Sequence, residues 1–334
     1  MNDLEKARRR RDSAFSLELD DVERDGKIQE MISLPDGLYT VSERAIYRTQ
    51  LADMIDPDLA HPNTPHVNQR FASAGSDNPI VGRTFLQAHR LFSKPHFDEE
   101  KRCLVMTAVL AGMQEILGAE DILTKLQADL LAAEKDLPSP HKGAMALPAV
   151  GDIEARGKAF VQRSEHALQA IFRLAVIFYG DTRKPGFFDG IAAHVRETFG
   201  EDENFVAFAD SMARFAKLIR GLRHSIEHRK PNQKIDFLDY HFEGGQLLRP
   251  TVRITHPDVP FNAMPLNEFL RFIVKNLIES LEALIVYLAA SNVSYFGKMP
   301  IAVGEHPHFG QGHVMVKYTY LIGIGDPPEW HPLG

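Results

Sequence analysis

The feature that most constrains this chain is a set of long segments in which apolar residues recur every three or four positions. One segment leads into the run Leu222–Pro231, and another covers about residues 264–290. Such spacing gathers apolar side chains into a stripe on one face of an α-helix, and striped helices bury that face against one another. The sequence therefore predicts a helical bundle. The stripe of the first segment consists of Phe205, Phe208, Met212, Phe215, Ile219, Leu222 and Ile226.

Helix boundaries are predicted from capping residues and helix breakers. Asp98 has a side chain suited to an N-cap, and Gly118 is expected to end the helix that follows. The prolines and glycine between residues 138 and 148 predict a linker. The predicted helices cover about residues 98–118, 122–136, 152–180, 187–199, 202–230 and 264–290.

Beyond Pro231 the pattern changes to that of strands. Residues 235–242 and 246–254 are strand-like and flank the pair Gly244-Gly245, which predicts a β-hairpin. Pro250 lacks a backbone N–H, so the second strand is expected at a sheet edge or beside a bulge.

These patterns together predict a mainly α protein, a helical bundle with a small β-hairpin insertion and an irregular C-terminal tail. Residues 1–80 are expected to be a loosely organised N-terminal segment with short strands or turns near 38–54. Residues 81–295 are expected to form the bundle, with the hairpin at about 234–255. Residues 296–334 are expected to form the tail, with one candidate strand at about 313–322.

Composition narrows the class of protein. The chain has 334 residues, of which 44% are hydrophobic and 25% charged, a balance typical of globular proteins. No apolar run reaches the roughly 18 residues of a membrane span, and no apolar signal core follows the N-terminal arginines, so a cytoplasmic location without a membrane partner is expected. The formal net charge of -7 argues against broad, nonspecific wrapping of nucleic acid but leaves room for a small basic cleft.

Two further observations concern particular residues. Cys103 is the only cysteine, which excludes an intramolecular disulfide and a cysteine-based zinc cluster. The arginine run Arg8–Arg11 is expected to be a solvated terminus rather than a phosphate contact.

Groups suited to catalysis gather at the end of the helix predicted from residue 202. Arg223 lies only about 50° from the centre of the apolar stripe, so its charge must find a partner or line a cleft. His228 would point roughly 140° away from Arg223 in an ideal helix. The two converge on one phosphate only if the helix ends near Glu227, as Pro231 favours, or if a second protomer supplies half of the site.

The segment Leu222-Arg223-His224-Ser225-Ile226-Glu227-His228 resembles the signature of HEPN domains, which are helical bundles. That signature is an arginine, a polar residue directly after it, and a histidine after four to six intervening positions. The resemblance is close over Leu222–Pro231 and extends as a general pattern of long helices over about residues 99–290. It implies that the predicted bundle is HEPN-like.

The resemblance also implies a function. HEPN ribonucleases cleave RNA without a metal or cofactor, commonly at a site shared by two copies of the domain, and some act as toxins or in defence under the control of a partner protein. His228 would be the general base or acid for attack by the 2′-hydroxyl, because imidazole titrates near neutrality. Arg223 would stabilise charge on the phosphate, and His224 would position groups in the site. Arg229 and Lys230 would contact the RNA backbone.

Other interpretations remain open. The bundle could be a noncatalytic module that binds RNA or a protein, or Arg223 could pair with a carboxylate while His228 is merely exposed. His224, Glu227 and His228 also read as His-x-x-Glu-His, which predicts a zinc-dependent hydrolase if a third ligand joins them. The arginine–histidine spacing recurs at Arg83/His89, Arg90/His96 and Arg249/His256, of which the last lies in a predicted strand.

Overall fold

The structure is a computed structural model that describes residues 5–6, 8–9, 11, 22–58, 60–61, 63–93, 96–135, 146–180, 186–201, 203–257, 263–293, 299–310 and 316–333. The chain forms two compact units. Unit 1 comprises Met1–Thr107 with Ala289–Gly334, and unit 2 comprises Ala108–Leu288. The domain boundaries predicted from the sequence, at 80/81 and 295/296, remain a prediction.

The prediction of a mainly α protein is wrong. About 54% of the described residues are helical and 23% lie in strands, and these strands form four sheets. The chain is therefore a mixed α and β protein, and a bundle with one hairpin insertion does not describe it.

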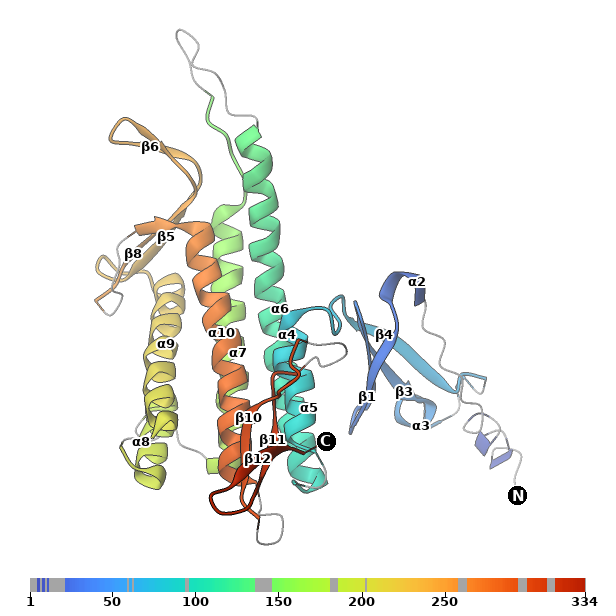
Figure 1. Ribbon diagram of the computed structural model, residues 1–334. Helices are drawn as coiled ribbons and strands as arrows, with labels where there is room; N and C mark the ends of the chain where they lie inside the picture. Colours follow the sequence, from blue (N-terminus) through green and yellow to red (C-terminus); the bar gives the residue numbers. More distant parts are fainter. Residues whose placement is uncertain are drawn as a thin grey trace. The chain divides into compact units, whose positions relative to one another are not determined.

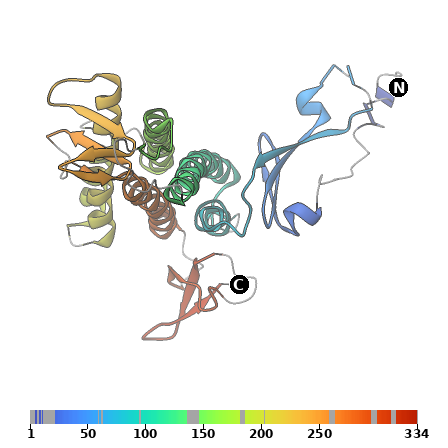
Figure 2. The same ribbon diagram turned by 90° about the horizontal axis from the view of Figure 1, so that it is seen from above.

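Unit 2 is built on long helices, as the apolar spacing predicted (Figure 1). Seen from above, the helices α6, α7 and α10 run side by side (Figure 2). The apolar residues that recur every three or four positions along the last predicted helix are all buried: Leu266, Phe269, Leu270, Ile273, Leu277, Leu281, Leu284 and Leu288. The helices are α6 (Glu99–Lys135), α7 (Ile153–Tyr179), α8 (Phe187–Phe199), α9 (Asn204–Glu227) and α10 (Leu266–Asn292).

One predicted helix end is wrong. Asp98 caps α6 as expected, because its side chain accepts a hydrogen bond from the backbone N–H of Lys101. Gly118, however, lies inside α6, which continues to Lys135. A Cβ at Gly118 would lie 3.2 Å from Nε of Arg163 on α7, so this glycine permits a close helix approach instead of ending the helix. The linker predicted from 138 to 148 lies mostly outside the described residues.

The predicted hairpin of unit 2 is present and divided into two pieces. Strand β5 (Lys234–Leu238) pairs with β8 (Thr251–Thr255), and β6 (His241–Glu243) pairs with β7 (Gln246–Leu248). Gly244 and Gly245 connect β6 to β7 with φ of 57° and 80°, the left-handed conformation of a tight hairpin turn. Strand β9 (Ala263–Pro265) extends the β5–β8 sheet, which lies over one end of α9 (Figures 1 and 2).

Unit 1 contains two sheets where the sequence predicted only isolated strands or turns. Strands β1 to β4 form an antiparallel sheet in chain order, and β2 and β3 overlap the short strands or turns expected near 38–54. Strands β10 to β12 form a second sheet where an irregular tail was expected, and β11 overlaps the one strand predicted there. Their bounds are β1 (Ile28–Leu34), β2 (Gly37–Ser42), β3 (Ile46–Leu51), β4 (His66–Ala72), β10 (Ile301–Glu305), β11 (Tyr318–Ile324) and β12 (Glu329–Pro332). The short helices are α2 (Val22–Asp25), α3 (Ala52–Ile55), α4 (Pro79–Val81), the π-helix η1 (Gly82–Leu86) and α5 (Gln87–Leu91).

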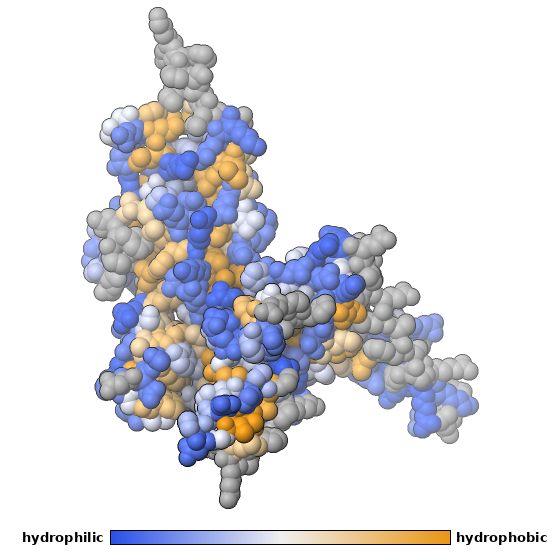
Figure 3. Space-filling view, in the orientation of Figure 1, coloured by the Kyte–Doolittle hydropathy of each residue, from blue (hydrophilic) through white to orange (hydrophobic). Residues whose placement is uncertain are grey.

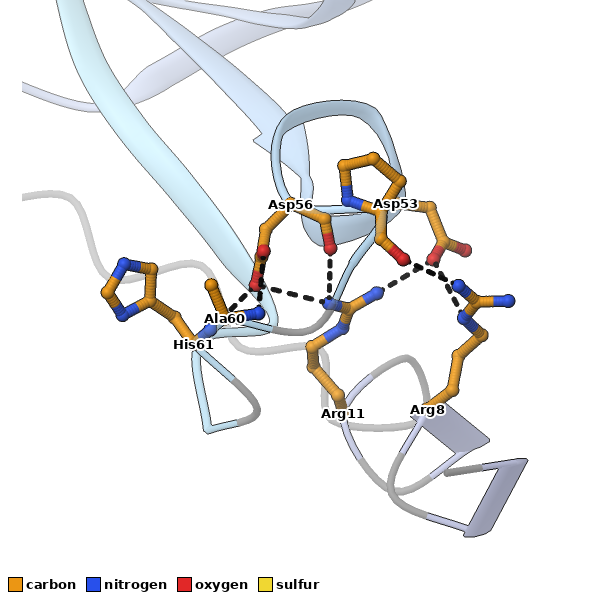
Figure 4. Close-up of polar contacts among 7 residues, drawn as sticks. Arg8, Arg11, Asp53, Asp56, Ala60 and His61 are labelled. Carbon is orange, nitrogen blue, oxygen red and sulfur yellow. Dashed lines mark hydrogen bonds and ion pairs between the residues drawn. The ribbon is translucent and has the colours of Figure 1, made fainter. Parts of the chain in front are cut away.

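Two arginines of the N-terminal run form hydrogen bonds within unit 1 (Figure 4), and one of them, Arg11, is buried rather than solvated. The Arg11 side chain is fully buried and donates hydrogen bonds to the backbone carbonyl of Asp56 and to the carboxylate of Asp53. Arg8 donates to the backbone carbonyl of Pro57. These contacts fasten the N-terminal residues to the segment that begins with α3, and Arg11 therefore has a structural role.

Replacement of Arg11 by alanine is expected to lower the free energy of unfolding by about 1 to 3 kcal/mol. The substitution removes a buried guanidinium together with its hydrogen bonds to Asp53 and Asp56. Arg8→Ala is the matched control and should change it by less than about 0.5 kcal/mol, because that side chain is half exposed. Denaturant unfolding of both variants measures the difference. Equal effects would show that Arg11 is not the residue that holds this segment.

One helix in the described chain, α6, is long and apolar enough to cross a membrane, but half of its most apolar window is buried inside the protein. On the face shown in Figure 3, hydrophilic residues are interspersed with hydrophobic ones along the helices of unit 2. Core helices of soluble proteins give the same composition signal, so α6 is weak evidence for a membrane span.

Candidate functional site

The predicted motif opens onto a groove in unit 2. The groove has a volume of about 560 Å³ and is lined by residues of α7, α9 and the segments that flank the β5–β8 sheet. Arg223, His224 and Glu227 of the motif contribute to its wall. The lining residues are Glu165, Lys217, Arg220, Gly221, Arg223, His224, Glu227, Gln233 and His256.

Arg223 is held between two carboxylates. Its Nε donates to Glu227 at 2.9 Å, one turn along α9, and its Nη1 donates to Glu165 on α7. The hydrogen bond to Glu227 raises the pKa of Arg223 above its ordinary value, burial opposes the rise, and the charge of Glu165 adds to it. In the described part of the chain, nothing accepts a hydrogen bond from Nη2 of Arg223. The guanidinium is therefore fixed in orientation and retains donors for a ligand.

Arg220 and Lys217 add positive charge to the same groove. Arg220 is exposed, and its guanidinium carbon lies 4.9 Å from the ring centroid of Phe187. Among the residues that the structure covers, no carboxylate pairs with Arg220. Lys217 pairs with Asp189 at 2.9 Å, but both side chains are about half exposed or more, so this pair is weak. Arg220 is therefore a cation that an anionic ligand can approach directly.

His224 faces the groove, whereas His228 does not line it. The helix α9 ends at Glu227, near the position that Pro231 favoured, and His228 follows as the C-cap with φ of -129° and ψ of 63°. Its ring turns toward His224, at 4.9 Å between ring centroids. The end of the helix thus places the two imidazoles together, and it brings His224 rather than His228 into the groove beside Arg223.

His256 follows β8 and enters the groove from the side of the sheet. Its ring packs over Gly221 of α9, where a Cβ would lie only 3.1 Å from Cε1 of His256. Glycine inside a helix costs stability relative to alanine, so this position has a structural reason to lack a side chain. The groove therefore contains an imidazole to which the sequence patterns gave no functional role.

The predicted backbone contacts Arg229 and Lys230 lie outside the lining of the groove. Arg229 forms an ion pair with Asp236 on β5 and its side chain is 61% exposed. The backbone of Lys230 pairs with that of Gln233 in a short bridge. Neither residue joins Arg223 in lining the groove, and their role in binding RNA stays a prediction.

The described residues provide no set of ligands for the predicted zinc site. Among the residues described, no group of three or more histidine, cysteine, aspartate or glutamate side chains is placed to hold a metal ion. Glu227 points its carboxylate at Arg223 instead of joining His224 and His228. The histidine-rich segment 305–313 forms no such group in its described part, and residues 311–313 lie outside it.

Sequence reasoning missed the residues that complete the groove. Lys217, Arg220 and His224 recur at steps of three and four, so a basic face of α9 was readable from the sequence. Glu165 is 58 positions from Arg223, and His256 lies beyond the intervening hairpin. Their proximity is produced by the packing of α7 and of the β5–β8 sheet against α9, for which the sequence carries no local signal.

No protein-family profile, curated protein or solved structure matches this chain. The resemblance of Leu222–Pro231 to the HEPN signature therefore stays a prediction.

Proposed function

We propose that the groove beside α9 binds RNA and cleaves it without a metal, through attack of a ribose 2′-hydroxyl on the adjacent phosphorus. The observation that supports this function best is the gathering of Arg223, Arg220 and His224 on one wall. Cationic donors and an imidazole are the groups that phosphodiester cleavage requires when no metal ion takes part.

Charge in the groove favours a phosphate ligand although the chain as a whole is acidic. Lys217, Arg220 and Arg223 contribute three positive charges to the lining, against the two carboxylates of Glu165 and Glu227. The whole chain has a formal net charge of -7. The groove lining is thus less acidic than the chain as a whole, and Arg220, which has no carboxylate partner among the described residues, offers the backbone of a single strand a direct contact.

Each side chain has a distinct part in the proposed reaction. Arg223, oriented by its ion pairs, and Arg220, free of a carboxylate within the described residues, stabilise the charge that builds on the phosphate oxygens. His224 transfers a proton at the reacting group, since it is the motif histidine that lines the groove. His228 contacts His224 from outside and orients it.

The remaining expectations belong to the same proposal. They are a HEPN-like origin of the Arg223 segment, a homodimer, a regulatory protein partner, a role as a toxin or in defence, and a cytoplasmic location.

A noncatalytic RNA-binding module is the second candidate, and one observation favours it. Both Glu165 and Glu227 already bind Arg223, as the inert interpretation of the motif expected, and these carboxylates offset much of its charge. A groove arranged in this way could hold a phosphate through Arg220 and Lys217 without promoting its cleavage.

Incubation of the protein with matched RNA and DNA strands in EDTA distinguishes these functions. The proposal expects cleavage of RNA alone, because DNA lacks the attacking hydroxyl. Binding of both strands without cleavage would establish the module instead. Cleavage that appears only when zinc is added, and that Glu227→Gln abolishes, would establish the zinc-dependent hydrolase.

Replacement of Lys217 or Arg220 by glutamine is expected to weaken RNA binding and to reduce its salt dependence. Each lost phosphate contact should lower the slope of log Kd against log salt concentration by about 0.7 for a single strand. Lys275→Gln on α10 is the matched control, since that lysine is exposed and lies outside the groove lining. Fluorescence anisotropy over a range of salt concentrations measures the slopes. Unchanged slopes in both groove variants would place the RNA elsewhere.

A further inference from the structure

The proposed reaction needs two proton transfers, whereas the Arg223 motif places only one imidazole in the groove. One group must take the proton of the 2′-hydroxyl, and another must give a proton to the departing 5′-oxygen. The two groups must lie on opposite sides of the phosphorus, because the incoming and leaving oxygens are roughly in line. An arginine does not serve as either group, since it remains protonated.

His256 is the second imidazole that lines the groove. Its Cε1 and Nε2 atoms would lie 3.1 and 3.2 Å from a Cβ at Gly221, so the ring sits directly over that residue of α9. His224 is three residues further along the same helix, where neighbouring Cβ positions are about 5–6 Å apart. His256 follows β8 and His224 belongs to α9, so the two imidazoles enter the groove from different elements.

Both imidazoles line the same groove, whose volume of about 560 Å³ has room for a phosphate. Arg220 and Arg223 flank the same stretch of α9 and provide positive charge beside the place where the phosphorus would lie. His256 is also partly buried, and its backbone directly follows the paired strand β8. It is thus carried by the sheet, whereas His224 is carried by the helix.

We propose that His256 and His224 are the proton-transfer pair of this groove, with a single-stranded RNA phosphodiester as the substrate between them. This inference rests on the proposed function and adds a catalytic residue to it. One imidazole accepts the 2′-hydroxyl proton while the 2′-oxygen bonds to phosphorus. The bond from phosphorus to the 5′-oxygen breaks, and the other imidazolium protonates that oxygen. The products are a 2′,3′-cyclic phosphate and a 5′-hydroxyl, and the two histidines exchange protonation states.

The charged groups that face the pair come from both helices. Glu165 approaches from α7, and Lys217, Arg220, Arg223 and Glu227 approach from α9. His228 contacts His224 from the end of α9. Because all these charged groups would contribute to a pH profile, the test relies on the chemistry of the leaving group instead.

The test compares two substrates with the full-length protein in EDTA. A dinucleotide has an alkoxide leaving group that must be protonated, whereas a uridine 3′-(4-nitrophenyl phosphate) releases a weak base that leaves without a proton. His224→Gln and His256→Gln should each slow cleavage of the dinucleotide about 100-fold or more. The variant that lacks the acid should recover to within about tenfold of wild type on the nitrophenyl ester, and the variant that lacks the base should not.

The outcomes separate this inference from the function on which it rests. If the wild-type protein cleaves neither substrate, the proposed function fails and the pair fails with it. If the wild-type protein cleaves and His256→Gln cleaves equally well, the pair alone is overturned. Equal loss on both substrates in both variants also overturns it.

Gly221→Ala tests the placement of His256 without removing either histidine. The added methyl would meet the His256 ring at 3.1 Å and displace it by a few tenths of an ångström. Cleavage of the dinucleotide should fall about tenfold while the Tm stays equal or rises, because alanine favours a helix interior. Unchanged cleavage with a displaced ring would contradict the pair.

Discussion

RNA cleavage is expected to fall by about 100- to 1,000-fold when Arg223 is replaced by lysine. Removal of one hydrogen-bond donor to a developing oxyanion lowers the rates of other enzymes by a similar factor. Lysine keeps the positive charge and can still pair with Glu165, so the buried carboxylate is not left alone. It cannot bind Glu165, Glu227 and a phosphate at once through a rigid planar group. Single-turnover cleavage with saturating protein measures the loss in the chemical step.

Arg214→Lys is the matched control for this substitution. It makes the same chemical change on α9 itself, at a side chain that is exposed and outside the groove lining. Cleavage by this variant should stay within about threefold of wild type, since substitutions at such exposed sites change free energies by about 0.5 kcal/mol. Equal losses in Arg223→Lys and Arg214→Lys would contradict a specific role for Arg223.

Replacement of Gly157 by valine is expected to destabilise unit 2 by about 3 kcal/mol, the upper range for overpacking a core. A Cβ at this position of α7 would lie 2.5 to 2.6 Å from ring carbons of Phe237 on β5. The ring is itself buried and cannot move aside without shifting β5. Because β5 pairs with β8, which precedes His256, cleavage should fall together with stability. Denaturant unfolding and cleavage measured on the same variant check both effects.

Gly112→Ala is the control for Gly157. Gly112 is also a helical glycine, but a Cβ there would meet only side-chain atoms of Leu281 and Ala170, at 3.3 and 3.5 Å. The substitution should be neutral or stabilising by up to about 1 kcal/mol. Gly157→Ala should lie between Gly112→Ala and Gly157→Val. Equal stability of all three variants would show that β5 does not pack tightly against α7.

The helices could be predicted because their apolar spacing extends over many turns. The positions and ends of α7, α8 and α10 follow from that spacing and from residues such as Gly180 and Gly200, which cap their helices. The error at Gly118 arose because glycine is found both at the ends of helices and inside helices where another side chain approaches closely. Only the packed neighbour Arg163 distinguishes them.

The sheets of unit 1 were missed for a different reason. Strand β1 buries only two of its seven positions and β4 buries none, whereas β2 is buried at five of its six positions. Short strands that are buried at few positions, or at nearly all of them, lack the alternation of buried and exposed side chains by which a strand is recognised. Strand pairing also depends on residues distant in the sequence, such as Ile28 with Ser42 and Leu51 with His66.

The candidate site could be predicted only in part. The position of Arg223 at the edge of an apolar stripe indicated that it needed a partner or a cleft, and the structure gives it both. The identity of the partner, Glu165, depends on how α7 packs against α9. The spacing pattern of Arg249 and His256 did not indicate a site, because the pair was assigned to a predicted strand. Its approach to Gly221 depends on the fold of the intervening sheet.

The RNA ends produced in EDTA test the central claim most directly, because they record which oxygen attacked the phosphorus. Mass spectrometry of RNA cut by the full-length protein should find 2′,3′-cyclic phosphates, or the 3′-phosphates that they yield on hydrolysis, together with 5′-hydroxyl ends. The same strand with 2′-O-methyl groups should remain intact. Ends with a 3′-hydroxyl and a 5′-phosphate, or cleavage of the methylated strand, would show attack by water and contradict the reaction proposed for this groove.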